Sequence, residues 1–363
     1  MRGFSGKFSV NPAVLLLVLV LICSVALMTG CSSDSGSDPS ADSGGVPGTV
    51  ISETENEITI VDQAGREVTV RRDPGSIAFC YRVVTRFLLN LGVGDRITGM
   101  GKTEPFLLEI EPSLEDTADV GKGVADIEAI AELGPDLFIH KAADTETLDA
   151  VQKIGIPSVG IEVETPEDML MALDILGKVC GAEERATELA DYYRKSISGS
   201  RKLAASVDDP DRKTAIVMGS SIGKVADGSM LQGEMLESAG AVNCAADLKA
   251  SELWPTAGTE QIFKWDPDYI FITGSGSASY TAEDLYSDPA WSELKAVKDK
   301  HIYVIPSALD SWEFPGIVSS LGVEYMQSMI YPELVTEKQL EQDVAGFYEL
   351  AYGRAFSREE LGY

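Results

Sequence analysis

The chain has 363 residues, 44% of them hydrophobic and 24% charged, and this length suggests two domains. Its 58 acidic and 29 basic residues give a formal charge of −29, which argues against nucleic-acid binding because phosphate affinity requires clustered cations. The two histidines, His140 and His301, and five cysteines without any C-x-x-C pair exclude a multi-histidine metal centre, a zinc ribbon and the common iron–sulfur runs within one chain.

Residues 1–30 have the pattern of a secretory signal peptide. Two basic residues precede an apolar run at 13–28, which is shorter than the ~20 apolar residues of a membrane-spanning helix. A permanent transmembrane anchor is the alternative. Small residues before Cys31 are similar to the lipobox of lipoproteins, although Met28 departs from the usual aliphatic residue. The sequence therefore predicts export, lipidation of Cys31 and attachment to the outer face of the cytoplasmic membrane.

Residues 31–50 are predicted to form a flexible linker, because they are rich in serine, glycine and aspartate and offer little apolar surface to bury. Residues 51–165 follow as a predicted N-terminal lobe that opens with a hairpin over 57–70. Short apolar strands then alternate with helices, which indicates a parallel sheet covered on both faces. The expected strands are 77–80, 97–100, 137–140 and 158–161, and the expected helices are 84–91, 127–133 and 145–154.

Residues 166–208 carry no strand pattern and are predicted to be helical, with a break at Gly181. The second helix has one continuous apolar face over about 25 residues, or ~37 Å, which is long enough to connect two lobes. Residues 209–363 are the predicted C-terminal lobe with a helical tail. Its expected strands are 214–218, 269–273 and 302–305. The predicted fold is thus α/β, with two Rossmann-like lobes of mainly parallel sheets joined by one long helix.

Two segments also resemble each other. EAIAELGPDLFI (128–139) and EQIFKWDPDYIF (260–271) align without a gap. Each has a carboxylate in the first turn of a predicted helix, which ends before Pro-Asp and leads into an apolar strand. This similarity predicts two copies of one α/β plan.

The mature chain resembles the substrate-binding proteins of ABC importers for iron–siderophores and cobalamin. The resemblance rests on the order and spacing of VDQAGREVTV (61–70), VGKGVADIEAIAELGPDLFI (120–139), WPTAGTEQIFKWDPDYIFITG (254–274) and FYELAYG (347–353). It implies a metal chelate held between two lobes, delivery to a permease dimer, and neither catalysis nor a cofactor. Metal chelatases have a related plan, but the sequence shows no nucleophile–base pair and no GxGxxG after the first strand.

The resemblance also implies that one glutamate in each lobe docks onto arginines of the permease. By position in the ADIEAI and GTEQIF phrases, these are Glu128 and Glu260. The alternative is that both are ordinary first-turn carboxylates, stabilised by the helix dipole by about 0.3–1 kcal/mol.

A ligand is expected beside the carboxyl ends of the parallel strands. Cations there suit an anionic ligand, and aromatic rings could stack on a flat or apolar chelate. Solvated cations and aromatic residues that pack between elements are the alternatives. The predicted ligand-binding residues are Tyr81, Arg82, Lys102, Lys141, Trp254, Trp312, Glu313 and Phe314, and no resident metal is predicted.

These observations predict a lipid-anchored protein that captures a metal chelate, first of all a ferric siderophore, and presents it to an ABC permease. Cobalamin, haem and a metal oxyanion are alternative cargoes, and haem stays among them because Tyr81 and His140 have suitable axial donors. A ligand sensor in the cell envelope is the alternative role.

Overall fold

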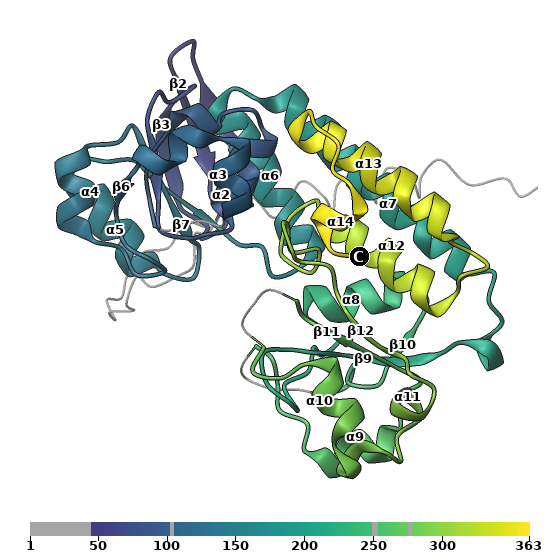
Figure 1. The fold of residues 1–363 in the computed structure, drawn as a ribbon. Coiled ribbons are helices and arrows are strands. Elements are labelled where there is room, and N and C mark those ends of the chain that lie inside the picture. The colour runs from purple at the N-terminus through teal and green to yellow at the C-terminus, as the bar shows by residue number, and fades with distance from the viewer. Residues whose placement is uncertain (1–44, 102–104, 249–252, 275–277) are drawn as a thin grey trace, which may run out of the picture. The chain divides into compact units, whose positions relative to one another are not determined.

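The computed structural model describes residues 45–101, 105–248, 253–274 and 278–363 (Figure 1). The predicted signal peptide, Cys31 and Lys102 lie outside these residues. Among the described helices, none combines the length and the apolar character that crossing a membrane requires.

The first parallel sheet has five strands in the order β6-β5-β4-β7-β8, and every neighbouring pair is parallel. Its central strands are short and buried along their length, because helices cover both faces and leave no solvent side for polar residues. The strands are β4 (Ile77–Phe79), β5 (Ile97–Met100), β6 (Ala118–Asp119), β7 (Leu137–Lys141) and β8 (Ser158–Ile161). The accompanying helices are α2 (Val84–Asn90), α3 (Pro105–Ile110), α4 (Ile127–Leu133) and α5 (Thr145–Lys153).

A three-stranded antiparallel sheet precedes this parallel sheet in the chain. It contains β1 (Val50–Glu53), β2 (Glu57–Val61) and β3 (Glu67–Arg71) in sequential order. The turn between β2 and β3 includes Gly65, whose φ of 75° requires the left-handed backbone that glycine adopts without strain. The hairpin predicted over 57–70 is therefore present, and β1 extends it by one strand.

The second parallel sheet has four strands in the order β10-β9-β11-β12. Its central strands β9 and β11 are apolar and almost entirely buried. The strands are β9 (Thr214–Met218), β10 (Val242–Asn243), β11 (Tyr269–Ile272) and β12 (Ile302–Val304). Helices α8 (Leu231–Ser238), α9 (Thr259–Trp265), α10 (Ala282–Ser287) and α11 (Lys295–Lys298) alternate with them.

Two long helices connect the parallel sheets. Helix α6 (Pro166–Cys180) starts at an N-cap, Thr165, whose side chain accepts a hydrogen bond from the Asp168 N–H, and it ends at Gly181 with a φ of 67°. Helix α7 (Glu183–Ala204) follows with 22 residues and buries the apolar face expected from the sequence. It lies beside α12 (Ser319–Ile330) and α13 (Glu337–Tyr352), and the chain ends with α14 (Arg358–Leu361) (Figure 1).

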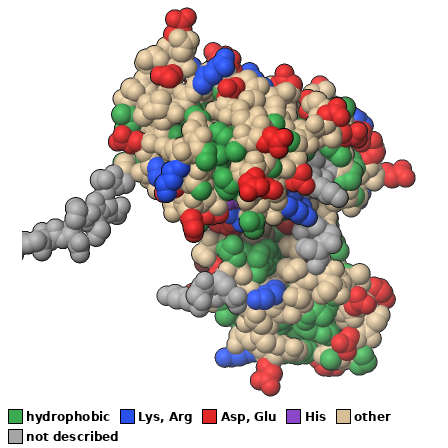
Figure 2. Space-filling model, turned by 90° about the vertical axis from the view of Figure 1, so that its left-hand side faces the viewer, with side chains coloured by type: hydrophobic (Ala, Val, Ile, Leu, Met, Phe, Trp, Pro, Cys, Tyr) green, Lys and Arg blue, Asp and Glu red, His purple; other side chains and the backbone are tan. Residues whose placement is uncertain are grey.

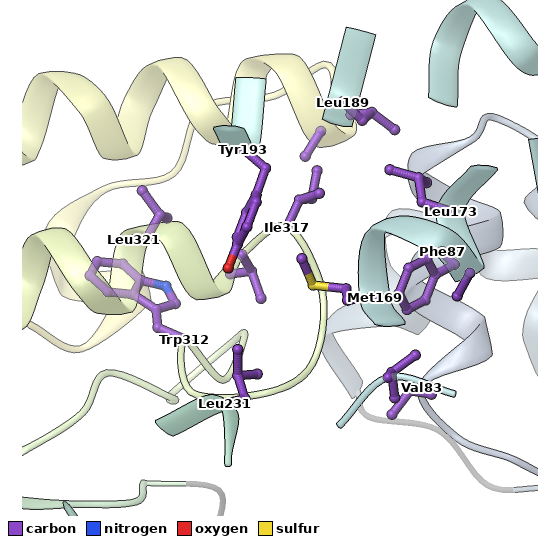
Figure 3. Packing of buried hydrophobic residues seen from close by; sticks show 14 of the residues in the cluster. Val83, Phe87, Met169, Leu173, Leu189, Tyr193, Leu231, Trp312, Ile317 and Leu321 are labelled. Carbon is purple, nitrogen blue, oxygen red and sulfur yellow. The ribbon is translucent and has the colours of Figure 1, made fainter. Parts of the chain in front are cut away.

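One apolar cluster runs through helices from both halves of the described chain. Figure 3 shows Val83 and Phe87 beside Met169 of α6, with Tyr193 of α7 and Ile317 leading on to Trp312 and Leu321. All of these side chains are almost completely buried. Burial of a large apolar side chain stabilises the folded state by about 1.5–3 kcal/mol, so the shared cluster ties α6 and α7 to both sheets.

A buried ion pair reinforces this cluster. Arg86 of α2 donates through Nε to Asp310 Oδ1 at 2.8 Å, and the exposed fractions of the two side chains are 2% and 0%. The residues are 224 positions apart in the chain. A charge this deeply buried requires an opposite charge and hydrogen bonds, so the pair fixes the segment after β12 against α2.

The predicted fold class is confirmed, with two mainly parallel α/β sheets and a long connecting helix. The observed core strands agree with the predicted strands to within one residue at each end. The short strands β1, β6 and β10 were not predicted, because two to four residues with mostly exposed side chains leave no apolar pattern to detect.

Asp310→Ala should destabilise the protein by about 3–5 kcal/mol, because it leaves the buried guanidinium of Arg86 without this carboxylate. Urea unfolding would measure the loss. Glu109→Ala is the matched control, since Glu109 pairs with Arg354 at 2.6 Å on the surface and should cost at most about 1 kcal/mol. Equal losses in the two variants would contradict the role given to the buried pair.

Candidate functional site

The strand orders locate one switch point in each parallel sheet. In the first sheet the order reverses between β4 and β7, and in the second it reverses between β9 and β11. Ligands of open α/β sheets bind outside the carboxyl ends of the strands at such points, because the connections diverge there and leave a crevice. The residues that follow these four strands are therefore the first candidates for a ligand site.

Tyr81 follows β4 and Lys141 is the last residue of β7, so both lie at the first switch point. The Lys141 Nζ lies 5.1 Å from the centroid of the half-buried Tyr81 ring. Burial, together with Glu164 and Glu162, raises the pKa of the Tyr81 phenol, so the hydroxyl is neutral at physiological pH. Burial also raises the pKa of the Glu164 carboxyl, and Glu162 adds to this shift while Lys141 opposes it. Lys141 therefore lies at the same edge of the first parallel sheet as the carboxylates of Glu162 and Glu164.

Arg82 and Phe314 connect this edge to the second half of the chain. The guanidinium carbon of exposed Arg82 lies 4.7 Å from the centroid of the Phe314 ring, and that of buried Arg86 lies 4.9 Å from it. A cation over an aromatic face is stabilised by the ring quadrupole. The structure thus brings together two predicted ligand residues that are far apart in the sequence.

Trp254 lies at the second switch point, against Gly219, which directly follows β9. A Cβ atom on Gly219 would lie 2.7 Å from the Trp254 ring, so only glycine permits this approach. The Tyr280 hydroxyl donates to the Gly219 carbonyl at 3.0 Å and holds the same loop. Trp254 itself is half-buried, which leaves part of its ring accessible.

Figure 2 shows a recess across the middle of one face of the molecule, with hydrophobic side chains inside it and charged side chains along its margins. Such a surface suits a ligand that has both apolar or aromatic parts and charge.

Trp312 and Glu313 lie in the core instead. The Trp312 side chain has no exposed surface, and its indole N–H donates to the Tyr348 hydroxyl at 2.9 Å. Glu313 is 2% exposed, and its backbone carbonyl accepts from Gln232. Both residues follow a strand in the sequence, but the chain turns inward there, so we leave them out of the ligand site.

Cys80, His140 and Asp144 form a chain of polar contacts beneath the first switch point. Cys80 Sγ lies 3.2 Å from His140 Nδ1, and His140 Nε2 lies 2.9 Å from Asp144 Oδ2. The order resembles the thiol–imidazole–carboxylate set of cysteine hydrolases, but burial raises the pKa of the Cys80 thiol to about 11. An activated cysteine has a lowered pKa and access to substrate, so this set is structural.

His140 is also unsuited to bind a metal. Its side chain is fully buried and both ring nitrogens are engaged, one with Cys80 and the other with Asp144. Across the described ranges, no group of three or more histidine, cysteine, aspartate or glutamate side chains is arranged to hold a metal ion.

Glu128 and Glu260 occupy equivalent positions, in the first turns of α4 and α9, and both are exposed. Asp126 caps α4, because its side chain accepts from the Ala129 N–H at 3.0 Å, whereas the N-cap residue of α9 is Gly258, which has no side chain to cap the helix. Each glutamate therefore presents a carboxylate at a helix N-terminus.

Three contributors to this region were missed in the sequence: Glu162, Glu164 and Gly219. Glu162 directly follows β8 and Gly219 directly follows β9, so the rule that selected Tyr81 and Lys141 would have found them. The contact between Gly219 and Trp254 has no sequence signal, because it joins loops 35 positions apart through their tertiary arrangement.

The chain matches the model of a family described as periplasmic binding protein over residues 77–309. It is 25% identical to an uncharacterised ABC transporter substrate-binding lipoprotein, YvrC, of Bacillus subtilis, with 77% of this chain and 87% of that protein covered. It is also 25% identical to the petrobactin-binding protein YclQ of the same species, over 86% and 96%. Among solved structures, the molybdate-bound MolA of Haemophilus influenzae has a TM-score of 0.72 at 18% identity, covering 82% of this chain and 99% of that one.

Cys80 should resist iodoacetamide in the native protein at pH 8. With a pKa of about 11, about one thiol in a thousand is ionised at that pH, and the side chain is buried. Peptide mass spectrometry would follow the modification, with the urea-unfolded chain as the control. Rapid alkylation of native Cys80 at neutral pH would mean that the thiol is activated after all.

Proposed function

From the premise that the chain belongs to the periplasmic binding protein family, we propose that its ligand is an anionic metal chelate, with a ferric siderophore as the first candidate. The chain is a substrate-binding protein of an ABC importer, a class that binds small ligands and delivers them to a permease and does not catalyse a reaction.

The observation that carries this proposal is the chemistry at the two switch points. Tyr81 with Lys141 and Arg82 with Phe314 combine aromatic surface with positive charge, and Trp254 adds a ring at the second sheet. A chelate whose organic shell surrounds a metal offers flat or apolar surface for the rings and oxyanions for the cations. Because the shell already satisfies the metal, the protein needs no metal ligands of its own.

The relatives support a metal-containing ligand in two forms. YclQ is named for petrobactin, and MolA was solved with molybdate. A tetrahedral oxyanion is small and needs mainly hydrogen-bond donors, so the aromatic rings at both switch points favour the larger chelate. Molybdate is therefore the second cargo to test, ahead of cobalamin and haem.

Delivery would use the two ends of the molecule that carry Glu128 and Glu260. Both carboxylates are exposed at helix N-termini in corresponding parts of the internal repeat, so two similar surfaces are available to a two-fold permease. The proposal includes the lipid anchor at Cys31, which would keep the protein near the permease.

Titration of the mature domain with ferric siderophores, molybdate, cobalamin and haem tests the cargo. We expect one class of ferric siderophore to bind saturably with a Kd below about 1 µM. Because ferric chelates absorb light, calorimetry should measure this Kd as well. Ligand binding should change the intrinsic tryptophan fluorescence. The variant Trp254→Phe should lose much of this change, because the buried Trp312 should respond little to the ligand.

Arg82→Ala should weaken binding of that chelate by about 1–3 kcal/mol, since it removes a charged hydrogen-bond donor from the site. Arg71→Ala is the control, because Arg71 on β3 is 65% exposed and lies 3.8 Å from Asp136, at the amino end of β7 and so at the opposite end of that strand from the switch point. Tight binding of molybdate alone, or equal affinity in both variants, would reject the chelate proposal.

The variant Glu128→Lys/Glu260→Lys should abolish uptake of the bound chelate into cells that depend on this protein, while the affinity measured by calorimetry stays unchanged. Charge reversal turns an attraction to permease arginines into repulsion. Glu146→Lys/Glu283→Lys is the matched control, because both residues are exposed first-turn carboxylates of other helices. Loss of chelate affinity in the first variant would place the glutamates in the ligand site instead.

A further inference from the structure

Two buried oxygen atoms on α12 have no hydrogen-bond donor among the described residues. They are Glu324 Oε2 and Gln327 Oε1. The two residues are three positions apart and so lie on the same face of the helix. Both side chains are otherwise held by α7. The Ser196 hydroxyl donates to Glu324 Oε1 at 2.6 Å, and Gln327 Nε2 donates to the Ser200 carbonyl at 2.9 Å. The orphan atoms are thus the two acceptors left over in a contact that is otherwise satisfied.

Solvent does not solve this shortage. Glu324 and Gln327 line a groove of about 470 Å³ between α7, α12 and α13, but the two oxygens themselves have almost no solvent-accessible surface. A buried acceptor without a donor costs about 1–3 kcal/mol, and a buried carboxylate charge costs more. One proton would relieve both costs: a protonated Glu324 gains an O–H donor, and Gln327 Oε1, three positions along the same helix, lacks a donor.

The surroundings favour the neutral acid. Burial is the largest effect and raises the pKa of the Glu324 carboxyl to about 7, with Asp343 of α13 adding to the shift and the Ser196 hydrogen bond opposing it. Asp343 is itself held by Gln339 at 3.0 Å. From α7, Tyr192 is a neutral phenol whose own pKa is raised by burial and by Glu324, so it brings no charge.

The remaining charges nearby do not neutralise Glu324. Lys195 of α7 lines the same groove but is exposed and forms no ion pair with Glu324 among the described contacts. Helix α8, which also packs on α12, carries Glu234, and that carboxylate is paired with Arg201 of α7 at 2.6 Å. A proton is therefore the available partner for Glu324.

We propose that Glu324 is a pH-sensitive latch between α12 and the connecting helix α7. As the neutral acid it donates its proton to Gln327 Oε1 and completes the contact with Ser196 and Ser200. When it loses the proton to solvent, a buried negative charge and an unpaired amide oxygen remain, and α12 loses part of its hold on α7.

The direction of the pH effect follows from the two states of the carboxyl. In the unfolded chain the carboxyl has its usual pKa of 4.5, and in the folded protein the pKa is about 7. Between these values the folded state binds more protons, so stability falls as the pH rises from about 4.5 and levels off above about 7. Acidic conditions close the latch, and alkaline conditions loosen it.

Glu324→Gln tests the latch, because the amide retains an acceptor for Ser196 and supplies an N–H for Gln327 at every pH. We expect the Tm of this variant to equal that of the native protein at pH 5 and to exceed it by at least about 3 °C at pH 8.5. Glu349→Gln, at an exposed position on α13, is the control and should show the same small difference at both values.

Carboxyl NMR of the native protein gives a second readout that does not depend on how the variant folds. The Glu324 signal should titrate near pH 7. In Gln327→Met, which removes the acceptor but keeps the side chain's length, that midpoint should shift. A Glu324 midpoint near 4.5, or a Tm difference for Glu324→Gln that is independent of pH, would overturn the proposal.

Discussion

The rest of the structure depends on one apolar cluster that continues from α2 through α6 and α7 to α12. Each parallel sheet has helices on both faces. A helix that lies between the two sheets must therefore pack its apolar face against elements of both halves. The apolar face of α7 meets this demand, because its buried residues pack against α6 on one side and α12 and α8 on the other. Within that cluster the Arg86–Asp310 pair adds directional specificity that apolar contacts lack.

This constraint explains where recognition can occur. The inward faces of the connecting helices pack into the shared core. Large aromatic side chains such as Trp312 and Tyr348 are buried in this core, where the Trp312 indole N–H donates a hydrogen bond to the Tyr348 hydroxyl. The segments that follow the carboxyl ends of the strands are not all packed into this core. Three partly exposed aromatic residues, Tyr81, Trp254 and Phe314, lie on such connections.

The sequence was sufficient for the fold, but not for the direction that the loops of the proposed ligand site take. Buried parallel strands are short apolar runs between helices, and the residues at the carboxyl end of each run can be identified in the sequence, as Tyr81 after β4 and Lys141 at the end of β7 show. What could not be read is the direction that a loop takes. Trp312 and Phe314 are two positions apart after the same strand, yet one enters the core and the other meets Arg82. That difference is set by tertiary packing, which leaves no local pattern.

The overall charge opposes binding of the proposed ligand, because a protein with a formal charge of −29 should repel an anionic chelate. The Debye length is about 8 Å at physiological ionic strength, so exposed carboxylates farther away than this contribute little at the site. The charges next to the ligand then decide affinity. The guanidinium carbon of Arg82 lies 4.7 Å from the centroid of the Phe314 ring, and the side chain is exposed. Lys141 interacts with Glu164, whose negative charge offsets its own, so the proposed site would depend mainly on Arg82 to attract an anionic ligand.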